Sequence, residues 1–124
     1  MPRILLVEDD ENLRDMVQEW LIFEKYTVAC CGSGLEAIEQ LSVLSFDIIL
    51  LDWHLNDVDG IDVLKKYRAA GGAAPVLMLT GSTTLAQREE ALVAGANSYL
   101  SKPFKLRDLS ANLTQLLAGS DSPR

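Results

Sequence analysis

Several polar side chains of this chain come directly after short apolar runs, and their types suit cation and phosphoryl chemistry. Asp52 follows the aliphatic run 48–51 and precedes a polar turn that closes at Gly60. Glu8 and Thr80 likewise come directly after such runs, and Asp9 and Lys102 come one residue later. If the runs are parallel strands, their carboxyl ends meet at one edge of a sheet, and these groups should converge there.

The carboxylates expected at this edge favour a hard divalent cation. Glu8, Asp9 and Asp52 would repel one another and raise each other's pKa if they lay close together without a positive partner. A cation relieves that repulsion, and an all-oxygen set without His or Cys partners favours Mg²⁺ over Ca²⁺ or Zn²⁺. Because Mg²⁺ keeps several waters and takes one or two carboxylates together with a phosphate, half of a phosphoryl-transfer site is indicated.

Asp52 can itself be the nucleophile, because a carboxylate that attacks phosphorus forms an aspartyl phosphate. Thr80 offers a hydroxyl and Lys102 a compact positive charge, and both groups suit the oxygens of a phosphoryl group. The residues therefore predict Asp52 as the phosphoryl acceptor, Asp9 as a metal ligand, and Thr80 and Lys102 as phosphoryl ligands.

Each of these residues also has an ordinary structural explanation. The acidic run 8–10 suits the solvated N-terminus of a helix, Thr80 suits a strand end, and Lys102 suits a surface position. An aspartate directly after four apolar residues is harder to explain in this way, and the joint placement of the groups favours a site. His54, the only histidine, is expected to be a loop residue near the mouth of that site, and Tyr99 by its type alone suits the core.

The apolar runs alternate with stretches of helical periodicity along the whole chain. The runs predict strands at 4–7, 26–31, 48–51, 76–79 and 98–100. Apolar residues at helical spacing predict helices at 13–21, 35–41, 61–67, 85–94 and 106–116. This alternation requires right-handed crossovers and a parallel sheet with helices on both faces, so the predicted fold class is α/β, a doubly wound (βα)5 sheet.

Local signals place several helix ends. An acid of the run 8–10 should cap the first helix, and Ser33 with Glu36 three residues on has the pattern of a capping box. Gly95 suits the residue that ends helix 85–94. That helix has a thin apolar stripe made largely of alanines, so we expect it to be the least firmly anchored.

Composition narrows the class of protein. The 124 residues suffice for one domain. The net charge of −7 argues against direct nucleic-acid binding by this domain, since phosphate contacts need clustered Lys and Arg. No apolar run reaches membrane-span length and no leader peptide follows Met1, so we expect no membrane contact and a cytoplasmic location. The adjacent cysteines 30 and 31 suit reduced thiols.

The strand-end motifs, taken together, resemble a known family. The motifs are Val7-Glu8-Asp9-Asp10, Leu51-Asp52, Asp59-Gly60, Leu79-Thr80-Gly81 and the Tyr-Leu-Ser-Lys-Pro-Phe segment 99–104. In this order and spacing they resemble the receiver domain of bacterial two-component response regulators, over about residues 3–117. The resemblance implies a flavodoxin-like, CheY-like sheet with strand order 2-1-3-4-5, a receiver domain at 1–118, and a polar tail or the start of a linker at 119–124.

The resemblance also implies roles for individual residues. Asp52 would accept a phosphoryl group from a sensor histidine kinase, and Lys102, in a cis peptide bond with Pro103, would hold a phosphoryl oxygen. Mg²⁺, for which Mn²⁺ could substitute, would be bound by Asp9, Asp52, the backbone carbonyl of His54, and Glu8 through water. Thr80 and Tyr99 would form a switch. Their movement would repack the surface of segments 85–94, 98–100 and 106–116, and this surface would control an output.

By this resemblance the domain would catalyse only its own phosphotransfer and slow autodephosphorylation, and it would be a signalling switch rather than an enzyme. The pattern is nearest to the DNA-binding, OmpR-like subfamily, which implies a phosphorylation-dependent homodimer through the switched surface, with Arg88 and Asp108 as one candidate charge pair. Asn56 stands where the family usually has Pro, so the turn after Asp52 is expected to be less rigid. His54 and Ser82 occupy positions that tune phosphoryl lifetime in the family.

Two other functions are alternatives to this one. An aspartate-nucleophile phosphohydrolase of the haloacid-dehalogenase kind needs a second acid two residues after the nucleophile, where this chain has His54. It also needs a cap that closes over the substrate, and these 124 residues leave no room for one. A phosphorylation-independent interaction module on the same fold is the main alternative. The intact acid set together with Thr80 and Lys102 argues against it.

Overall fold

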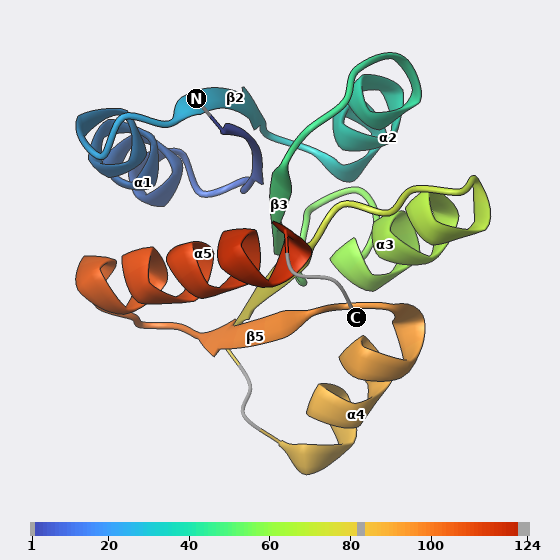
Figure 1. The fold of residues 1–124 in the computed structure, drawn as a ribbon. Helices are drawn as coiled ribbons and strands as arrows, with labels where there is room; N and C mark the ends of the chain where they lie inside the picture. Colours follow the sequence, from blue (N-terminus) through green and yellow to red (C-terminus); the bar gives the residue numbers. More distant parts are fainter. Residues whose placement is uncertain (1, 82–83, 122–124) are drawn as a thin grey trace.

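The computed structural model describes residues 2–81 and 84–121 and has the expected alternation of strands and helices (Figure 1). The elements in chain order are β1 (Arg3–Val7), α1 (Glu11–Phe23), β2 (Thr27–Cys31), α2 (Gly34–Val43), β3 (Ile48–Asp52), α3 (Gly60–Ala69), β4 (Val76–Thr80), α4 (Leu85–Ala94), β5 (Ser98–Ser101) and α5 (Leu106–Asp121). All neighbouring strands are parallel, and their order is β2-β1-β3-β4-β5. Fold class and strand order are therefore as predicted.

The strand register brings the strand ends level with one another. Val7 pairs with Leu51, so the residue after β1 comes level with Asp52 in the neighbouring strand. Asp52 in turn pairs with Leu79, which places the end of β4 beside it. On the far side of β4, Thr80 pairs with Ser101, so the residue after β5 reaches the same edge. The pairing alone thus gathers the polar residues that follow the apolar runs.

The central strands have apolar residues on both faces because helices cover both sides of the sheet (Figure 1). In β1, Leu5 and Val7 belong to the core under α2, α3 and α4, whereas Ile4 and Leu6 belong to the core under α1 and α5. All four side chains are fully buried. Burial of each such side chain contributes roughly 1.5–3 kcal/mol, which is why continuous apolar runs form these strands.

Helix ends follow the local signals. The Asp10 carboxylate accepts a hydrogen bond from the Leu13 amide at 3.2 Å, and the Ser33 hydroxyl accepts one from the Glu36 amide at 3.2 Å. Gly95 has a φ of 112°, in the left-handed region that glycine adopts without strain, and it ends α4. Within α4, Ala91 is the buried residue, as expected for a thinly anchored helix.

Two details differ from the sequence interpretation. Met16 and Leu35 stand at the apolar spacing that predicts helices 13–21 and 35–41, but they are 45% and 61% exposed. The buried lines of their helices run instead through Val17 in α1 and Ala37 in α2, since a single central line of each helix faces the sheet. At the other end of the chain, α5 continues through Asp121, so residues 119–121, expected in the tail, are helical.

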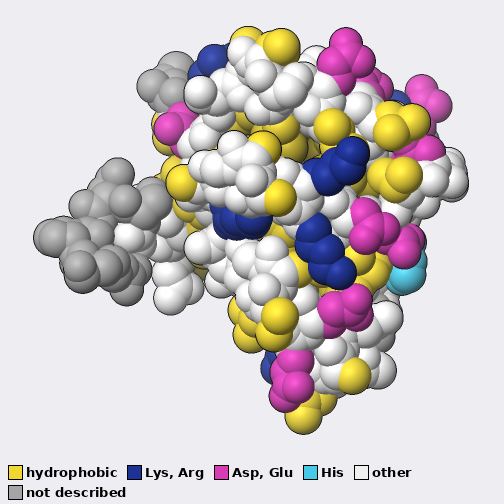
Figure 2. Space-filling view, turned by 90° about the vertical axis from the view of Figure 1, so that its right-hand side faces the viewer, with side chains coloured by type: hydrophobic (Ala, Val, Ile, Leu, Met, Phe, Trp, Pro, Cys, Tyr) yellow, Lys and Arg dark blue, Asp and Glu magenta, His cyan; other side chains and the backbone are white. Residues whose placement is uncertain are grey.

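Surface charge is mixed on the face shown in Figure 2. Lys and Arg side chains there lie among Asp and Glu side chains, with hydrophobic side chains between them. Interspersed charge of both signs is typical of a solvated surface. Among residues 2–81 and 84–121, no helix combines the length and the apolar composition that a membrane span requires. Cys30 and Cys31 are free thiols in β2.

Candidate functional site

Three carboxylates meet at the carboxyl edge of the sheet. Glu8 and Asp9 follow β1, Asp52 ends β3, and one oxygen of each lies within 4.8 Å of the others. Glu8 and Asp52 are only 1% and 3% exposed, whereas Asp9 is half-buried. Two buried carboxylates in contact require a positive partner, because burial disfavours their charged forms and their charges repel.

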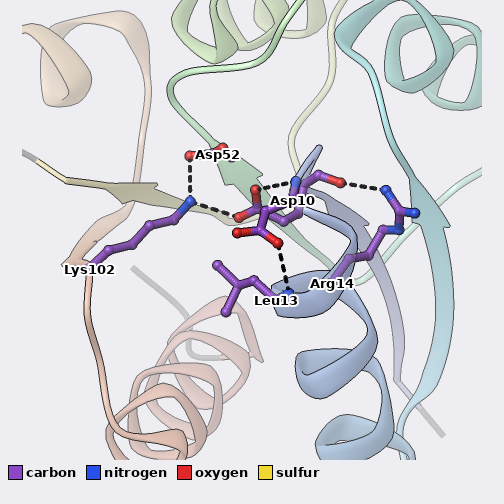
Figure 3. A network of polar contacts seen from close by, with 6 residues as sticks. Asp10, Leu13, Arg14, Asp52 and Lys102 are labelled. Carbon is purple, nitrogen blue, oxygen red and sulfur yellow. Dashed lines mark hydrogen bonds and ion pairs between the residues drawn. The ribbon is translucent and has the colours of Figure 1, made fainter.

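Lys102 supplies that positive charge. Its Nζ lies 2.8 Å from Glu8 Oε1 and 3.1 Å from Asp52 Oδ1, and Figure 3 shows the side chain extending from the segment after β5 toward Asp52. Burial lowers the pKa of Lys102, but its hydrogen bond to Glu8 and the charge of Asp52 outweigh burial, so the pKa is raised. Burial raises the pKa of Glu8 to about 7, although the hydrogen bond from Lys102 acts in the opposite direction.

The loop after β1 is held by contacts of its backbone. The Asp10 amide donates to Glu8 Oε2 at 3.1 Å, and Arg14 Nη1 donates to the Glu8 carbonyl at 2.9 Å (Figure 3). The Glu8 amide donates to the carbonyl of Cys31 in β2 at 3.0 Å. Sequence reasoning missed Arg14, because an arginine one helical turn into α1 reads as an ordinary surface charge.

Thr80 and Lys102 are brought together at the end of the β4–β5 pair. The Lys102 amide donates to the Thr80 carbonyl at 2.7 Å, and Thr80 is fully buried. The Lys102–Pro103 peptide bond is cis, the isomer that the family resemblance implies. Tyr99 is half-buried in β5, and the Arg88 guanidinium lies 5.7 Å from the centre of its ring. Ser82, expected to tune phosphoryl lifetime, lies outside the described residues.

The loop 53–59, here called the acceptor loop, closes tightly on itself behind Asp52. The Gly60 amide donates to the Trp53 carbonyl at 2.6 Å, and His54 and Asp59 form an antiparallel bridge. A Cβ at Gly60 would lie 2.0 Å from the Asp52 carbonyl oxygen, so only glycine allows this close return of the chain. The side chain of His54 is exposed, whereas its backbone is held by the bridge.

The donor set fits a hard divalent cation. In the described part of the chain, the cluster Glu8, Asp9 and Asp52 offers carboxylate oxygens within reach of one ion. Mg²⁺ prefers oxygen ligands and keeps several waters, which the half-exposed position of Asp9 allows. Asp52 also has the features of a nucleophile, since its carboxylate lies at a strand end beside a fixed cation, Lys102.

Comparison with known proteins agrees with this geometry. The family model described as "Response regulator receiver domain" matches residues 4–114. The chain belongs to this family. Response regulator MprA of Mycobacterium ulcerans is 37% identical over 115 residues, which are 93% of this receiver domain and 50% of the relative. The chain thus spans about half the length of the curated relatives it matches.

Solved receiver domains have the same architecture. The receiver domain of a Francisella response regulator is similar with a TM-score of 0.93 and 25% identity, covering 98% of this chain and 100% of that one. The receiver domain of a sensor histidine kinase from Pseudomonas aeruginosa has a TM-score of 0.86 and 32% identity, covering 94% of this chain and 98% of that one. That structure has a magnesium ion coordinated in its active-site cleft.

Proposed function

We propose that this receiver domain accepts a phosphoryl group from a sensor histidine kinase onto Asp52 and thereby switches the surface of α4, β5 and α5. The observation that carries the proposal is the position of Asp52. It is a carboxylate at the end of a buried strand, 3% exposed, 3.1 Å from the Lys102 ammonium and in one cluster with Glu8 and Asp9. A structural role for that carboxylate alone would not require two further acids beside it.

In the proposed reaction, an Asp52 carboxylate oxygen attacks the phosphorus of a phosphohistidine. The new P–O bond forms as the P–N bond breaks, and the imidazole of the kinase leaves with the electron pair and takes up a proton. Lys102 is already in reach of the acceptor carboxylate and would hold a phosphoryl oxygen. The same site would release the phosphoryl group slowly to water, and the domain would act on no other substrate.

Asp9, Asp52 and the His54 carbonyl would hold Mg²⁺ directly, with Glu8 acting through water, and Mn²⁺ could substitute because it also accepts oxygen ligands. When bound, the ion would neutralise charge on the carboxylates and on the incoming phosphoryl oxygens. Its charge would also replace part of the compensation that Lys102 now gives to Glu8 and Asp52. Lys102 would then be released toward the phosphoryl group.

The output step would run through Thr80 and Tyr99. Thr80 would move onto the phosphoryl group, and Tyr99 would turn inward behind it, which removes the ring from its contact with Arg88. The Arg88 guanidinium would then be free to pair with Asp108 of a second copy, as in a phosphorylation-dependent homodimer. Weak anchoring of α4 through Ala91 favours such a change, because locally unstable elements are the ones that move.

Phosphoryl transfer from a small donor tests the proposal without knowledge of the kinase. The protein would be incubated with acetyl phosphate and Mg²⁺ and analysed by intact mass. We expect one phosphoryl group on the wild type, none on Asp52→Asn, and none after EDTA treatment. Asp59→Asn removes a charge from the same loop and should still be modified.

An unmodified wild type, or an Asp52→Asn variant that still gains the phosphoryl mass, would refute the proposal. The first result would favour the phosphorylation-independent interaction module.

A cytoplasmic location is also part of the proposal. The kinase that would supply the phosphoryl group uses ATP, and both cysteines are free thiols, as is typical of a reducing compartment.

A further inference from the structure

The acceptor loop is attached at its tip to a different helix. The Asp57 carboxylate reaches from the loop to the N-terminus of α2, where Oδ1 accepts from the Gly34 amide and Oδ2 from the Leu35 amide, both at 2.9 Å. These amides are among the helix donors that have no partner within α2. Both oxygens are engaged, so the carboxylate fixes the position and the orientation of the loop tip.

Close packing accompanies this contact. A Cβ at Gly34 would lie 2.3 Å from Val58 Cγ2 and 3.4 Å from Leu55 Cδ1, so the first turn of α2 lies against the acceptor loop with no room for a side chain. Leu55 is buried and Val58 is half-buried. The loop is therefore held at its base by the Gly60–Trp53 hydrogen bond and at its tip by α2.

The attachment explains how a loop without proline can stay in place. Asn56 lacks the fixed φ that a proline would impose on this turn, so the backbone of the loop has more freedom in the unattached state. Asp57 is the next residue, and its paired hydrogen bonds restrict the same turn from the outside. The negative charge also lies at the positive end of the α2 dipole, which adds to the attraction.

We propose that Asp57 is a positioning residue for the cation site, acting through the acceptor loop on the backbone carbonyl of His54. This inference rests on the proposed function, because it assumes that the carbonyl contributes to Mg²⁺ binding. Groups that hold a metal ligand in place from outside typically change metal affinity about 10–100-fold when they are removed. The His54–Asp59 bridge joins the two sides of the loop, so a shift of the tip is passed to His54.

Calorimetry with Mg²⁺ tests the inference, because it measures the affinity of the site for the ion without any phosphoryl transfer. We expect Asp57→Ala to weaken Mg²⁺ affinity roughly tenfold. Ser33→Ala is the matched control for helix stability, because it removes the other N-terminal hydrogen bond of α2 and leaves the loop attached. Asp62→Asn is the matched control for charge, since Asp62 is exposed in the first turn of α3 and lies outside the acceptor loop. Both controls should bind Mg²⁺ within about twofold of the wild type.

A second variant keeps the test decisive if Asp57→Ala is poorly folded. Asp57→Asn retains one acceptor oxygen and should weaken Mg²⁺ binding by an intermediate amount. Amide hydrogen exchange at Gly34 and Leu35 should speed up in both Asp57 variants, and more in Asp57→Ala, which verifies that the attachment is weakened.

The inference is overturned if the exchange speeds up while Mg²⁺ affinity stays within about twofold of the wild type, or if Ser33→Ala weakens binding equally. In either case a wild type that still acquires a phosphoryl group leaves the proposed function standing. A wild type that neither binds Mg²⁺ nor acquires the phosphoryl group overturns both.

Discussion

At the scale of single residues, Lys102 balances the charge of the site. Two carboxylates that are almost completely buried share its ammonium group, at 2.8 and 3.1 Å. Hydrogen bonds and opposite charge raise the pKa of Lys102 against the effect of burial, so it stays protonated at neutral pH. The half-buried Asp9 lies in the same cluster, which leaves the site with an excess of negative charge that a cation would relieve.

Replacing Lys102 tests this balance. Lys102→Met keeps an unbranched side chain, one atom shorter, and leaves Glu8 and Asp52 without their positive partner, so we expect the free energy of unfolding to fall by about 2–3 kcal/mol at neutral pH. Lys105→Met removes an equal charge from an exposed position on the same loop and should cost under about 0.5 kcal/mol. Urea denaturation measures both values.

The sign of the pH dependence follows from Glu8. The pKa of Glu8 in the folded protein is already raised, and loss of Lys102 raises it further above the unfolded value. Ionising Glu8 in the folded variant therefore costs free energy of unfolding, and this cost grows as the pH rises. The loss in Lys102→Met should therefore be smaller at about pH 5 than at about pH 8. An equal loss at both pH values would show that the destabilisation comes from packing rather than charge.

At the scale of elements, Arg68 joins three segments at the edge of the sheet opposite the site. Its guanidinium donates to the carbonyls of Gly95, Gly72 and Ala74 at 2.8–3.1 Å, and to Asn97 Oδ1 at 2.9 Å. The end of α3 is thereby tied to the segment before β4 and to the turn between α4 and β5. Burial lowers the pKa of Arg68, yet arginine remains charged in proteins.

Arg68→Lys keeps the charge but not the planar arrangement of donors, so it should leave several of these carbonyls unpaired. We expect a loss of about 2 kcal/mol in the free energy of unfolding, measured by urea denaturation. Lys66→Arg on the same helix is exposed and should be neutral. A neutral Arg68→Lys would mean that water replaces the lost hydrogen bonds.

The contact between Asp57 and α2 predicts a dependence on acid. Hydrogen bonds from the Leu35 and Gly34 amides lower the pKa of Asp57 from its ordinary value of 3.8. A lowered pKa contributes stability that is present above the ordinary value and is lost as pH falls through the lowered one. Asp57→Asn should therefore be less stable than the wild type near neutral pH, and the two should converge as the pH drops below 3.8. Urea denaturation across this range measures the difference.

At the scale of the whole molecule, the domain is held by two cores on either side of one sheet, and the site lies where five loops leave its edge. A ligand that joins β1 and β3 at that edge should stabilise the whole fold, since it binds only when the strands are paired. At about one hundred times its dissociation constant, Mg²⁺ would add about 2.7 kcal/mol.

This stabilisation is measurable by thermal denaturation. For a domain of this size we expect the unfolding midpoint to rise by roughly 10 °C at saturating Mg²⁺. Asp9→Asn should abolish most of the rise, whereas Asp59→Asn should keep it. A wild type whose midpoint is unchanged by Mg²⁺ would show that the acid cluster does not bind the ion.

Much of this protein follows from its sequence alone. Apolar runs of strand length alternate with helical stripes, and this alternation determines the doubly wound sheet because each run must be covered on both faces. The convergence of Glu8, Asp52 and Lys102 is predictable for the same reason, since each lies at or just past the end of a strand and parallel strands end at one edge.

Only the tertiary structure decided the contacts that hold the site in place. The contacts of Arg14 with the Glu8 carbonyl and of Asp57 with α2 join segments that no periodic pattern relates. Trp20 and Ser110, 90 positions apart in the chain, form a hydrogen bond between α1 and α5 for which the sequence has no signal. Periodicity reports which face of an element is buried, but a hydrogen bond between two elements depends on their relative placement, which is set by packing of the complete core.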